Sequence, residues 1–147
     1  MEYNDPIENS FKKIESILEF TKGVKIIMAI DNNSRSTLWH DVTTNARGTL
    51  LEEFVANNQL HIINEERPRT TFHNIRGQSN IDITIADNKI LAAIETWEIS
   101  EEENASDHNI IKFHIKIKKD GRIITNPSEF RFIIKGSTAV RLLRETL

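Results

Sequence analysis

Apolar and polar positions follow two spacings along this chain, one typical of helices and one typical of strands. Between residues 7 and 21 the apolar side chains recur every three or four positions, which predicts an amphipathic helix that ends near Gly23. Residues 24–30 form a nearly continuous apolar run, as expected for a strand covered on both faces. The same reasoning predicts a helix over 49–57 and strands over 60–63, 70–72, 81–85, part of 90–99, and 109–117.

The pattern weakens beyond residue 119. We expect residues 1–119 to form the folded domain, and residues 120–147 to form a linker followed by a short basic helix over 140–147. Strands outnumber helices among the predicted elements, and the two kinds are mixed along the chain. The sequence therefore predicts an α/β (α+β) protein.

Composition narrows the class of protein. A length of 147 residues suits one domain with a hydrophobic core of useful size. The absence of cysteine excludes disulfides and thiolate metal sites. No apolar run approaches the ~20 residues that span a bilayer, so no membrane partner is expected.

Charge is distributed unevenly. The net charge of −3 argues against a protein that coats nucleic acid non-specifically. Residues 95–107 carry six acidic side chains and no basic one, whereas residues 112–147 carry nine basic and three acidic ones. This asymmetry fits an enzyme that collects metal ions and contacts phosphates locally, and it fits a plain solvated surface at least as well.

Three short polar clusters stand at the ends of predicted strands. They are Asp31-Asn32-Asn33, Ser79-Asn80-Ile81-Asp82 and Ser106-Asp107-His108. Each is weak evidence alone, because an aspartate after a strand is more often a turn or helix-cap residue. Asp82 is harder to explain in this way, since it lies within an apolar strand and buried carboxylates are rare unless paired. Together the clusters suggest a single site at one edge of a sheet.

The order and spacing of these clusters resemble one protein family. The motifs run Asp31-x-Asn33, Trp39, Arg47-Gly48, Thr71-Phe72, Gly77, Ser79-x-Ile81-Asp82, Trp97 and Ser106-Asp107-His108. Over about residues 7–118 the chain is similar to the C-terminal half of an endonuclease/exonuclease/phosphatase domain. Within that superfamily it is most similar to the endonucleases of non-LTR retrotransposons of the R1, TRAS and jockey type. The resemblance implies part of a four-layer α/β/β/α sandwich, DNase I-like, that lacks the N-terminal half.

The resemblance also implies a reaction, the Mg²⁺- or Mn²⁺-dependent hydrolysis of a DNA phosphodiester that nicks one strand. The catalytic positions match Asp31, Asn33, Asp82 and His108, the phosphate contacts match Asn33, Ser79 and His108, and the metal ligands match Asp107 and Asp31. These residue types suit the chemistry. A carboxylate can orient or deprotonate water, an amide can hold a phosphate oxygen without adding charge, and an imidazole partnered by a carboxylate can donate to the scissile phosphate.

Part of the family pattern has no counterpart in this chain. The resemblance implies an asparagine, a metal-binding glutamate and a tyrosine from the N-terminal half, and none is matched here. Asp31 and Asp107 without that glutamate should hold Mg²⁺ poorly, because Mg²⁺ demands near-octahedral oxygen ligands. We therefore expect a fragment with little activity of its own, whose parent protein also contains the missing half or a reverse transcriptase region.

Two other functions fit the same residues. The chain could be a degenerate or domesticated fragment that binds nucleic acid or protein without catalysis, or a phosphatase of the same superfamily. A DNA substrate implies an intracellular, nuclear site of action, and the turn at 73–78 is the candidate for choosing the target. The remaining motif residues have simpler expected roles: Trp39 and Trp97 in the core, Arg47-Gly48 at a helix start, and Glu101-Glu102-Glu103 in a solvated loop.

Overall fold

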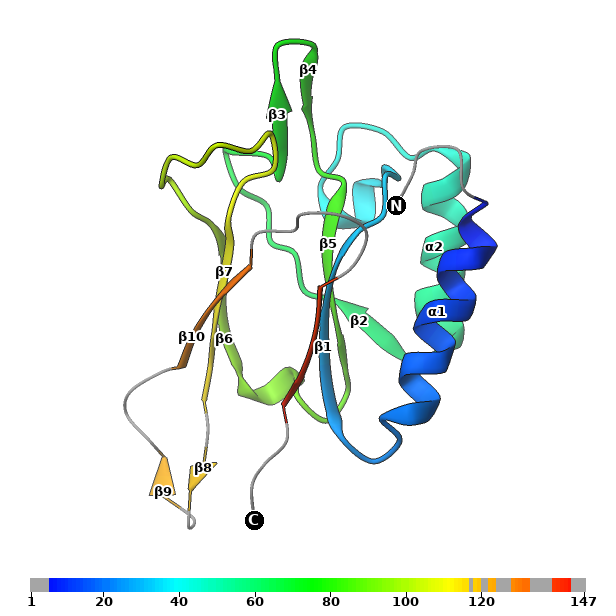
Figure 1. The fold of residues 1–147 in the computed structure, drawn as a ribbon, viewed down its shortest axis with the longest axis vertical. Helices are drawn as coiled ribbons and strands as arrows, with labels where there is room; N and C mark the ends of the chain where they lie inside the picture. The colour runs from blue at the N-terminus through cyan, green and yellow to red at the C-terminus, as the bar shows by residue number, and fades with distance from the viewer. Residues whose placement is uncertain (1–5, 117, 120–121, 124–127, 133–138, 144–147) are drawn as a thin grey trace.

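The computed structural model describes residues 6–116, 118–119, 122–123, 128–132 and 139–143. Two β-sheets pack face to face, and two helices cover the outer face of one sheet (Figure 1). The layers therefore follow the order α/β/β, and the expected α/β class is confirmed. Neither helix of these residues has the length and apolar character needed to cross a membrane.

The elements agree with most of the predicted ranges. They are α1 (Ile7–Phe20), β1 (Lys25–Asp31), the 3-10 turn η1 (Thr37–Trp39), α2 (Ala46–Asn57), β2 (Leu60–Ile62), β3 (Phe72–Asn74), β4 (Gly77–Ser79), β5 (Asp82–Asp87), the 3-10 turn η2 (Leu91–Ala93), β6 (Ile94–Ile99), β7 (Ile111–Ile115), β8 (Lys118–Lys119), β9 (Arg122–Ile123), β10 (Ser128–Phe132) and β11 (Ala139–Leu143). Helix α2 begins three residues before its predicted start.

The first sheet has the strand order β11-β1-β5-β2, and the second has the order β10-β7-β6. All neighbouring strands in both sheets are antiparallel. Strands β1 and β5 form the centre of the first sheet. Their register places Ile27 opposite Ala86 at one end and Asp31 opposite Asp82 at the other.

Strand β1 is buried on both faces, as its unbroken apolar run predicts. Alternate side chains of a strand point to opposite faces. One set of β1 side chains packs against the helices, and the other set packs between the two sheets. Ile27 and Ala29 belong to the second set. Asp31 has the same parity, so its carboxylate lies on the side of the second sheet.

Two hydrophobic clusters hold the layers together. Between the helices and the first sheet, the Phe11 and Phe54 rings stack with centroids 4.3 Å apart. Between the sheets, the Trp97 indole is almost fully buried and donates a hydrogen bond of 3.0 Å from Nε1 to Thr84 Oγ1. Trp39 is fully buried in the helix-side cluster. Both tryptophans are core residues, as expected.

The C-terminal segment differs from its prediction. Residues 139–143 form strand β11, which pairs with β1 from Lys25 opposite Leu143 to Ala29 opposite Ala139. The expected basic helix is therefore wrong for residues 140–143, and residues 144–147 lie outside the described part of the chain. The buried strand β1 has backbone N–H and C=O groups along its outer edge that need partners. Pairing with β11 supplies those partners, and this need arises only once the sheet is assembled.

The stretch between the predicted strands at 70–72 and 81–85 folds back on itself. Strands β3 and β4 form a separate hairpin in which Phe72 lies opposite Ser79, and it projects from one end of the sandwich (Figure 1). Gly77 has a φ of 149°, a backbone conformation that side chains rarely permit. The hairpin leaves Thr71 outside regular strand structure, and β5 then begins at Asp82.

The loop that follows β1 is held by the start of α2. Asn45 caps this helix, since its Oδ1 accepts a hydrogen bond of 2.8 Å from Gly48 N. The Asn45 backbone N–H donates to Arg35 O at 3.0 Å. A Cβ atom on Gly48 would lie 1.9 Å from Arg35 O, so only glycine allows the helix and the loop to approach this closely. Arg47 and Gly48 start a helix, as expected.

Replacing Gly48 with alanine should destabilise the protein, although alanine is the better helix former by about 1 kcal/mol in an open helix. The added methyl group must displace the Arg35 backbone, and overpacking of this kind costs about 1–3 kcal/mol. Urea unfolding measures the change. Glu53→Ala, at an exposed position of the same helix, is the matched control and should change stability by less than about 0.5 kcal/mol. A Gly48→Ala chain as stable as the parent would contradict this close approach.

Candidate active site

Two carboxylates lie side by side where β1 ends and β5 begins. Asp31 and Asp82 are directly opposite each other in the antiparallel register, so their side chains leave the same face of the sheet. Asp82 exposes 1% of its surface and Asp31 exposes 8%. Two like charges placed in this way repel each other and lose hydration. The arrangement therefore needs a partner that donates hydrogen bonds or carries positive charge.

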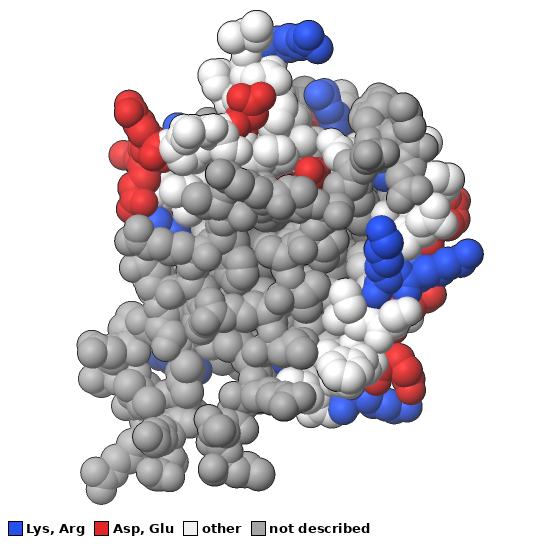
Figure 2. Space-filling model, in the orientation of Figure 1, with Lys and Arg blue, Asp and Glu red and all other residues white. Residues whose placement is uncertain are grey.

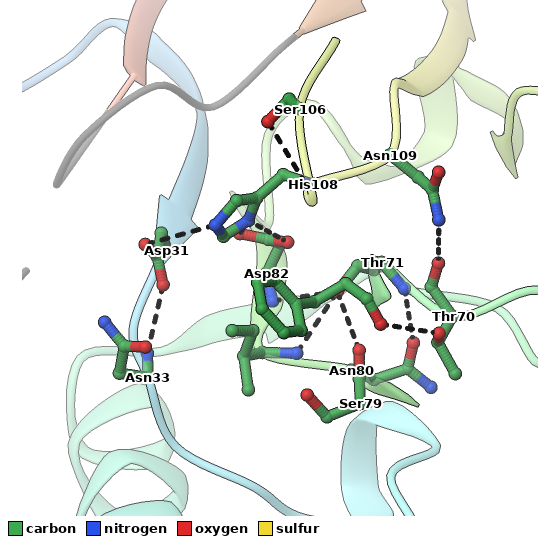
Figure 3. A network of polar contacts seen from close by, with 12 residues as sticks. Asp31, Asn33, Thr70, Thr71, Ser79, Asn80, Asp82, Ser106, His108 and Asn109 are labelled. Atoms are coloured by element: carbon green, nitrogen blue, oxygen red, sulfur yellow. Dashed lines mark hydrogen bonds and ion pairs between the residues drawn. The ribbon is translucent and has the colours of Figure 1, made fainter. Parts of the chain in front are cut away.

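His108 is that partner (Figure 3). Its Nδ1 lies 2.9 Å from Asp82 Oδ2 and 3.1 Å from Asp82 Oδ1. On the other side of the ring, Nε2 lies 4.0 Å from Asp31 Oδ2. The imidazole thus lies between the two carboxylates, and its side chain remains 20% exposed. A carboxylate at Nδ1 fixes the ring orientation and leaves Nε2 toward Asp31 and solvent.

The loop that carries His108 is fastened to the start of the β3–β4 hairpin. The backbone of His108 forms an isolated antiparallel bridge with Phe72, and the two rings meet edge to face at 5.0 Å. His73 N donates to Asp107 O at 2.8 Å, and Asn109 N donates to Thr71 O at 2.7 Å. These contacts join residues that lie more than 30 positions apart in the sequence and place the imidazole over Asp82.

Burial and hydrogen bonding shift the proton affinities of the pair. Burial raises the pKa of Asp82, although the hydrogen bond and charge of His108 act in the opposite direction. The hydrogen bond to Asp82 raises the pKa of His108, burial opposes that shift, and the charges of Asp82, Asp31 and Asp107 add to it. Both shifts mean that the pair keeps a proton to higher pH than the separate groups would. Such a pair is suited to proton donation near neutral pH.

The remaining predicted site residues lie around this centre. Asn33 follows β1 with a left-handed φ of 48°, and its backbone N–H donates to Asp31 Oδ1 at 3.2 Å. Ser79 is buried at the end of β4 and is paired with Phe72. Ser106 Oγ accepts a hydrogen bond of 3.2 Å from His108 N, which shapes the loop around the histidine.

Asp107 lies apart from the other predicted metal ligand. Its exposed side chain accepts a hydrogen bond of 3.4 Å from Asn74 Nδ2 on the hairpin. Among the described residues, one group of acidic and histidine side chains has its ligand atoms within 4.8 Å of one another, and it consists of Asp31, Asp82 and His108. The structure therefore brings Asp31 close to Asp82 and His108, whereas Asp107 points toward the hairpin.

The donor chemistry of this group fits a hard divalent cation only in part. Both Asp82 oxygens are engaged by His108, and Asp31 Oδ1 accepts from Asn33 N. Asp31 Oδ2 lies 4.0 Å from His108 Nε2, and Asp107 is close enough to raise the pKa of His108. Mg²⁺ is commonly held by one or two carboxylates together with waters and substrate phosphate. Asp31 and Asp107 can supply that small protein share.

The structure also reveals two polar residues near the site for which the sequence suggested no role. Thr71 appears in the motif pattern only as a threonine before Phe72, and Asn80 is the open position of the Ser79-x-Ile81-Asp82 motif. Both are buried. Thr71 makes hydrogen bonds to the segments that carry Asp82 and His108, and Asn80 makes hydrogen bonds to Thr71 and to the loop after β1. The sequence does offer one signal for Asn80: it lies next to an apolar strand, and a buried amide there needs hydrogen-bond partners.

Sequence comparison relates this chain to one family of known proteins. Residues 2–112 match the model of a family described as endonuclease-reverse transcriptase. The chain is 32% identical over 106 residues to the retrovirus-related Pol polyprotein of the type-1 retrotransposable element R1 of Bradysia coprophila, covering 67% of this chain and 10% of that protein. It is 28% identical over 119 residues to a protein in the type-1 retrotransposable element R1DM of Drosophila melanogaster, covering 75% of this chain and 12% of that one.

A solved structure agrees in fold. The endonuclease domain of TRAS1, a telomere-specific non-LTR retrotransposon, superposes with a TM-score of 0.73 and 32% sequence identity. The match covers 81% of this chain and 54% of that chain, so this chain spans about half of that domain. The fold is thus DNase I-like and represents part of the expected four-layer sandwich. The family model covers most of the chain, and the chain belongs to the endonuclease–reverse transcriptase family of retrotransposon endonuclease domains.

Proposed function

We propose that this chain carries the phosphodiesterase chemistry of a DNA endonuclease, the hydrolysis of one DNA strand to leave a nick. The observation that supports this most strongly is the Asp82–His108 hydrogen bond beside Asp31, at a partly open edge between two sheets. A buried carboxylate that orients an imidazole toward a second carboxylate is an arrangement for moving protons. Family membership makes a DNA phosphodiester the fitting substrate.

Each residue of the site has a separate role in the proposed reaction. A water molecule attacks phosphorus while the bond from phosphorus to the leaving oxygen breaks, and the departing oxygen takes up a proton from solvent to become a hydroxyl group. Asp31 orients this water and takes its proton, and protonated His108 donates from Nε2 to the phosphate group on which charge develops. Asp82 holds the imidazole and favours its protonated form. Asn33 and Ser79 contact phosphate oxygens without adding negative charge.

A divalent cation, Mg²⁺ or Mn²⁺, would be held by Asp31 and Asp107. When bound, it would polarise the phosphoryl oxygens and offset their charge. Two carboxylates that point toward different neighbours make a sparse ligand set. We propose that the 147-residue chain by itself binds this cation weakly and cleaves slowly.

The β3–β4 hairpin is the proposed contact with DNA outside the reacting phosphate. Ile75 at its turn is fully exposed, with a relative accessibility of 103%, and the neighbouring Arg76 is exposed as well. The acidic run Glu101–Glu103 is exposed on the loop between β6 and β7, where Figure 2 shows acidic side chains gathered. DNA would avoid that loop and approach the hairpin side. A nuclear site of action follows from a DNA substrate.

A second function, binding of nucleic acid without cleavage, is favoured by the sparse ligand set at Asp31 and Asp107. The fold, the hairpin and the hydrogen-bonded pair would persist in such a protein, while cation affinity would be too low for turnover. The two functions differ in one measurable property, the dependence of strand cleavage on the side chains of the site.

Nicking of supercoiled plasmid in the presence of Mg²⁺ or Mn²⁺ tests the proposal. Asp31→Asn and His108→Ala should each reduce the nicking rate by about 10²–10⁴-fold, the typical contribution of general acid–base groups, with DNA affinity largely kept. His61→Ala, which removes an exposed histidine from the far edge strand β2, should leave the rate unchanged. A parent chain that binds DNA without nicking it, at any cation concentration, would instead support the binding function.

The pKa of His108 offers a second test, carried out by NMR titration in metal-free buffer. In the parent it should lie above the ordinary value of 6.5, and Asp82→Asn should lower it, because the hydrogen bond to Asp82 is its main cause. A raised pKa in the folded state means that His108 stabilises the fold fully below the unfolded pKa and less as pH rises through the folded pKa. An unchanged His108 pKa in Asp82→Asn would contradict the assigned pairing.

A further inference from the structure

Asn80 is the residue marked x in the Ser79-x-Ile81-Asp82 motif, and all four of its polar groups make hydrogen bonds. Its backbone N–H donates to Asp41 Oδ2 at 2.7 Å, and its backbone carbonyl accepts from Trp39 Nε1 at 2.9 Å. Its side chain donates from Nδ2 to His40 O at 2.7 Å and accepts at Oδ1 from Thr71 N at 2.9 Å. The amide orientation is fixed by these contacts, since one end faces a carbonyl and the other faces an N–H. Asn80 therefore ties the loop after β1 to the residue before the hairpin.

Thr71 carries the connection onward to both members of the catalytic pair (Figure 3). Its hydroxyl oxygen accepts from Ile81 N and from Asp82 N, each at 3.1 Å. Its backbone carbonyl accepts from Asn109 N at 2.7 Å, one residue beyond His108. The side chain of Thr71 is fully buried. A single residue thus contacts the strand that carries Asp82 and the loop that carries His108.

The hydrogen bonds of Asn80 and Thr71 lie in a region where few strand-to-strand hydrogen bonds are formed. The β1–β5 ladder ends at Asp31 opposite Asp82, and β4 ends at Ser79, so residues 80 and 81 lie between two strands. The loop before β7 meets the hairpin through the isolated bridge between Phe72 and His108. The position of Asp82 relative to His108 therefore depends on side-chain and irregular backbone hydrogen bonds, which a mutation can remove without dismantling a sheet.

We infer that Asn80 is a positioning residue, which acts through Thr71 to hold Asp82 and His108 at hydrogen-bond distance. This inference rests on the proposed function, because the alignment of the pair matters for turnover only if the pair acts in the reaction. Asn80 touches neither the reacting phosphate nor water in this role. Its contribution is the placement of Thr71, whose hydroxyl and carbonyl then orient the two segments.

A purely structural role for Asn80 is the simpler alternative, and it predicts a different effect of mutation. A residue that only stabilises the fold changes the midpoint of unfolding and leaves the geometry of the pair in the folded molecules unchanged. A positioning residue changes the Asp82–His108 hydrogen bond in molecules that are still folded. The imidazole Nδ1–H proton reports this bond directly, because a hydrogen bond to a buried carboxylate shifts its NMR signal downfield and protects it from exchange with water.

The experiment uses the 147-residue chain labelled with ¹⁵N, with the His108 ring signal identified by its loss in His108→Gln. Asn80→Ala and Thr71→Val should each abolish or broaden the Nδ1–H signal under conditions where circular dichroism shows a folded chain. Thr71→Ser, which keeps the hydroxyl, should retain it. Asn58→Ala is the matched control, since Asn58 makes a side-chain hydrogen bond to Phe54 O at the end of α2, away from the site.

Nicking rates provide the second measurement. Asn80→Ala and Thr71→Val should lower kcat by up to about 100-fold, as small misplacements of reacting groups do, with little change in KM. An unchanged His108 signal in either folded variant overturns the inference, whatever the activity of the parent. If the parent does not nick DNA and the signal is still lost in these variants, the positioning role stands and the proposed function fails. Each variant tests the inference by itself, so if one of them does not fold, the other still gives the answer.

Discussion

The pairing of β1 with β5 is the constraint on which the site depends. Antiparallel register brings Asp31 and Asp82 directly opposite each other, on the face that the second sheet covers. The same pairing divides the side chains of β1 between two cores, one against the helices and one against the second sheet. A shift of one residue in this pairing would turn the side chains of one strand to the opposite face. The two carboxylates would then point to different layers, and the apolar side chains of that strand would lose their core partners. The core thus enforces the register that creates the site.

His108 resolves the electrostatic problem that this register creates. Two buried carboxylates cannot both remain charged at low cost, and the imidazole between them supplies a hydrogen bond to one and partial positive charge near the other. The result is a pair with raised proton affinity that stays partly open to solvent. The stabilisation of the site and its proposed chemistry therefore have the same physical origin.

Much of the fold and of the site could be predicted from the sequence. The buried strand β1, the amphipathic helix α1 and the tryptophans of the core all follow from spacing and residue type. The ordered motifs pointed to Asp31, Asp82 and His108, which the structure does bring together. The helix predicted for residues 140–143 is wrong, because these residues form a strand that pairs with the edge of β1. A local sequence pattern carries no information about which strand edge lacks a partner. The separation of Asp107 from Asp31 was also invisible, since the hairpin that Asp107 contacts is itself placed by long-range pairing.

Taken alone, the sequence determined which residues could act and which elements would carry them, because residue chemistry and apolar periodicity are local properties. Tertiary structure decided which of these residues meet. Asp31, Asp82 and His108 come from three separate segments, and the distances between them depend on strand register and on the hydrogen bonds around Thr71 and Asn80. The role of Asn80 can be seen only in the folded structure, because the hydrogen bonds of a buried amide depend on the groups that surround it.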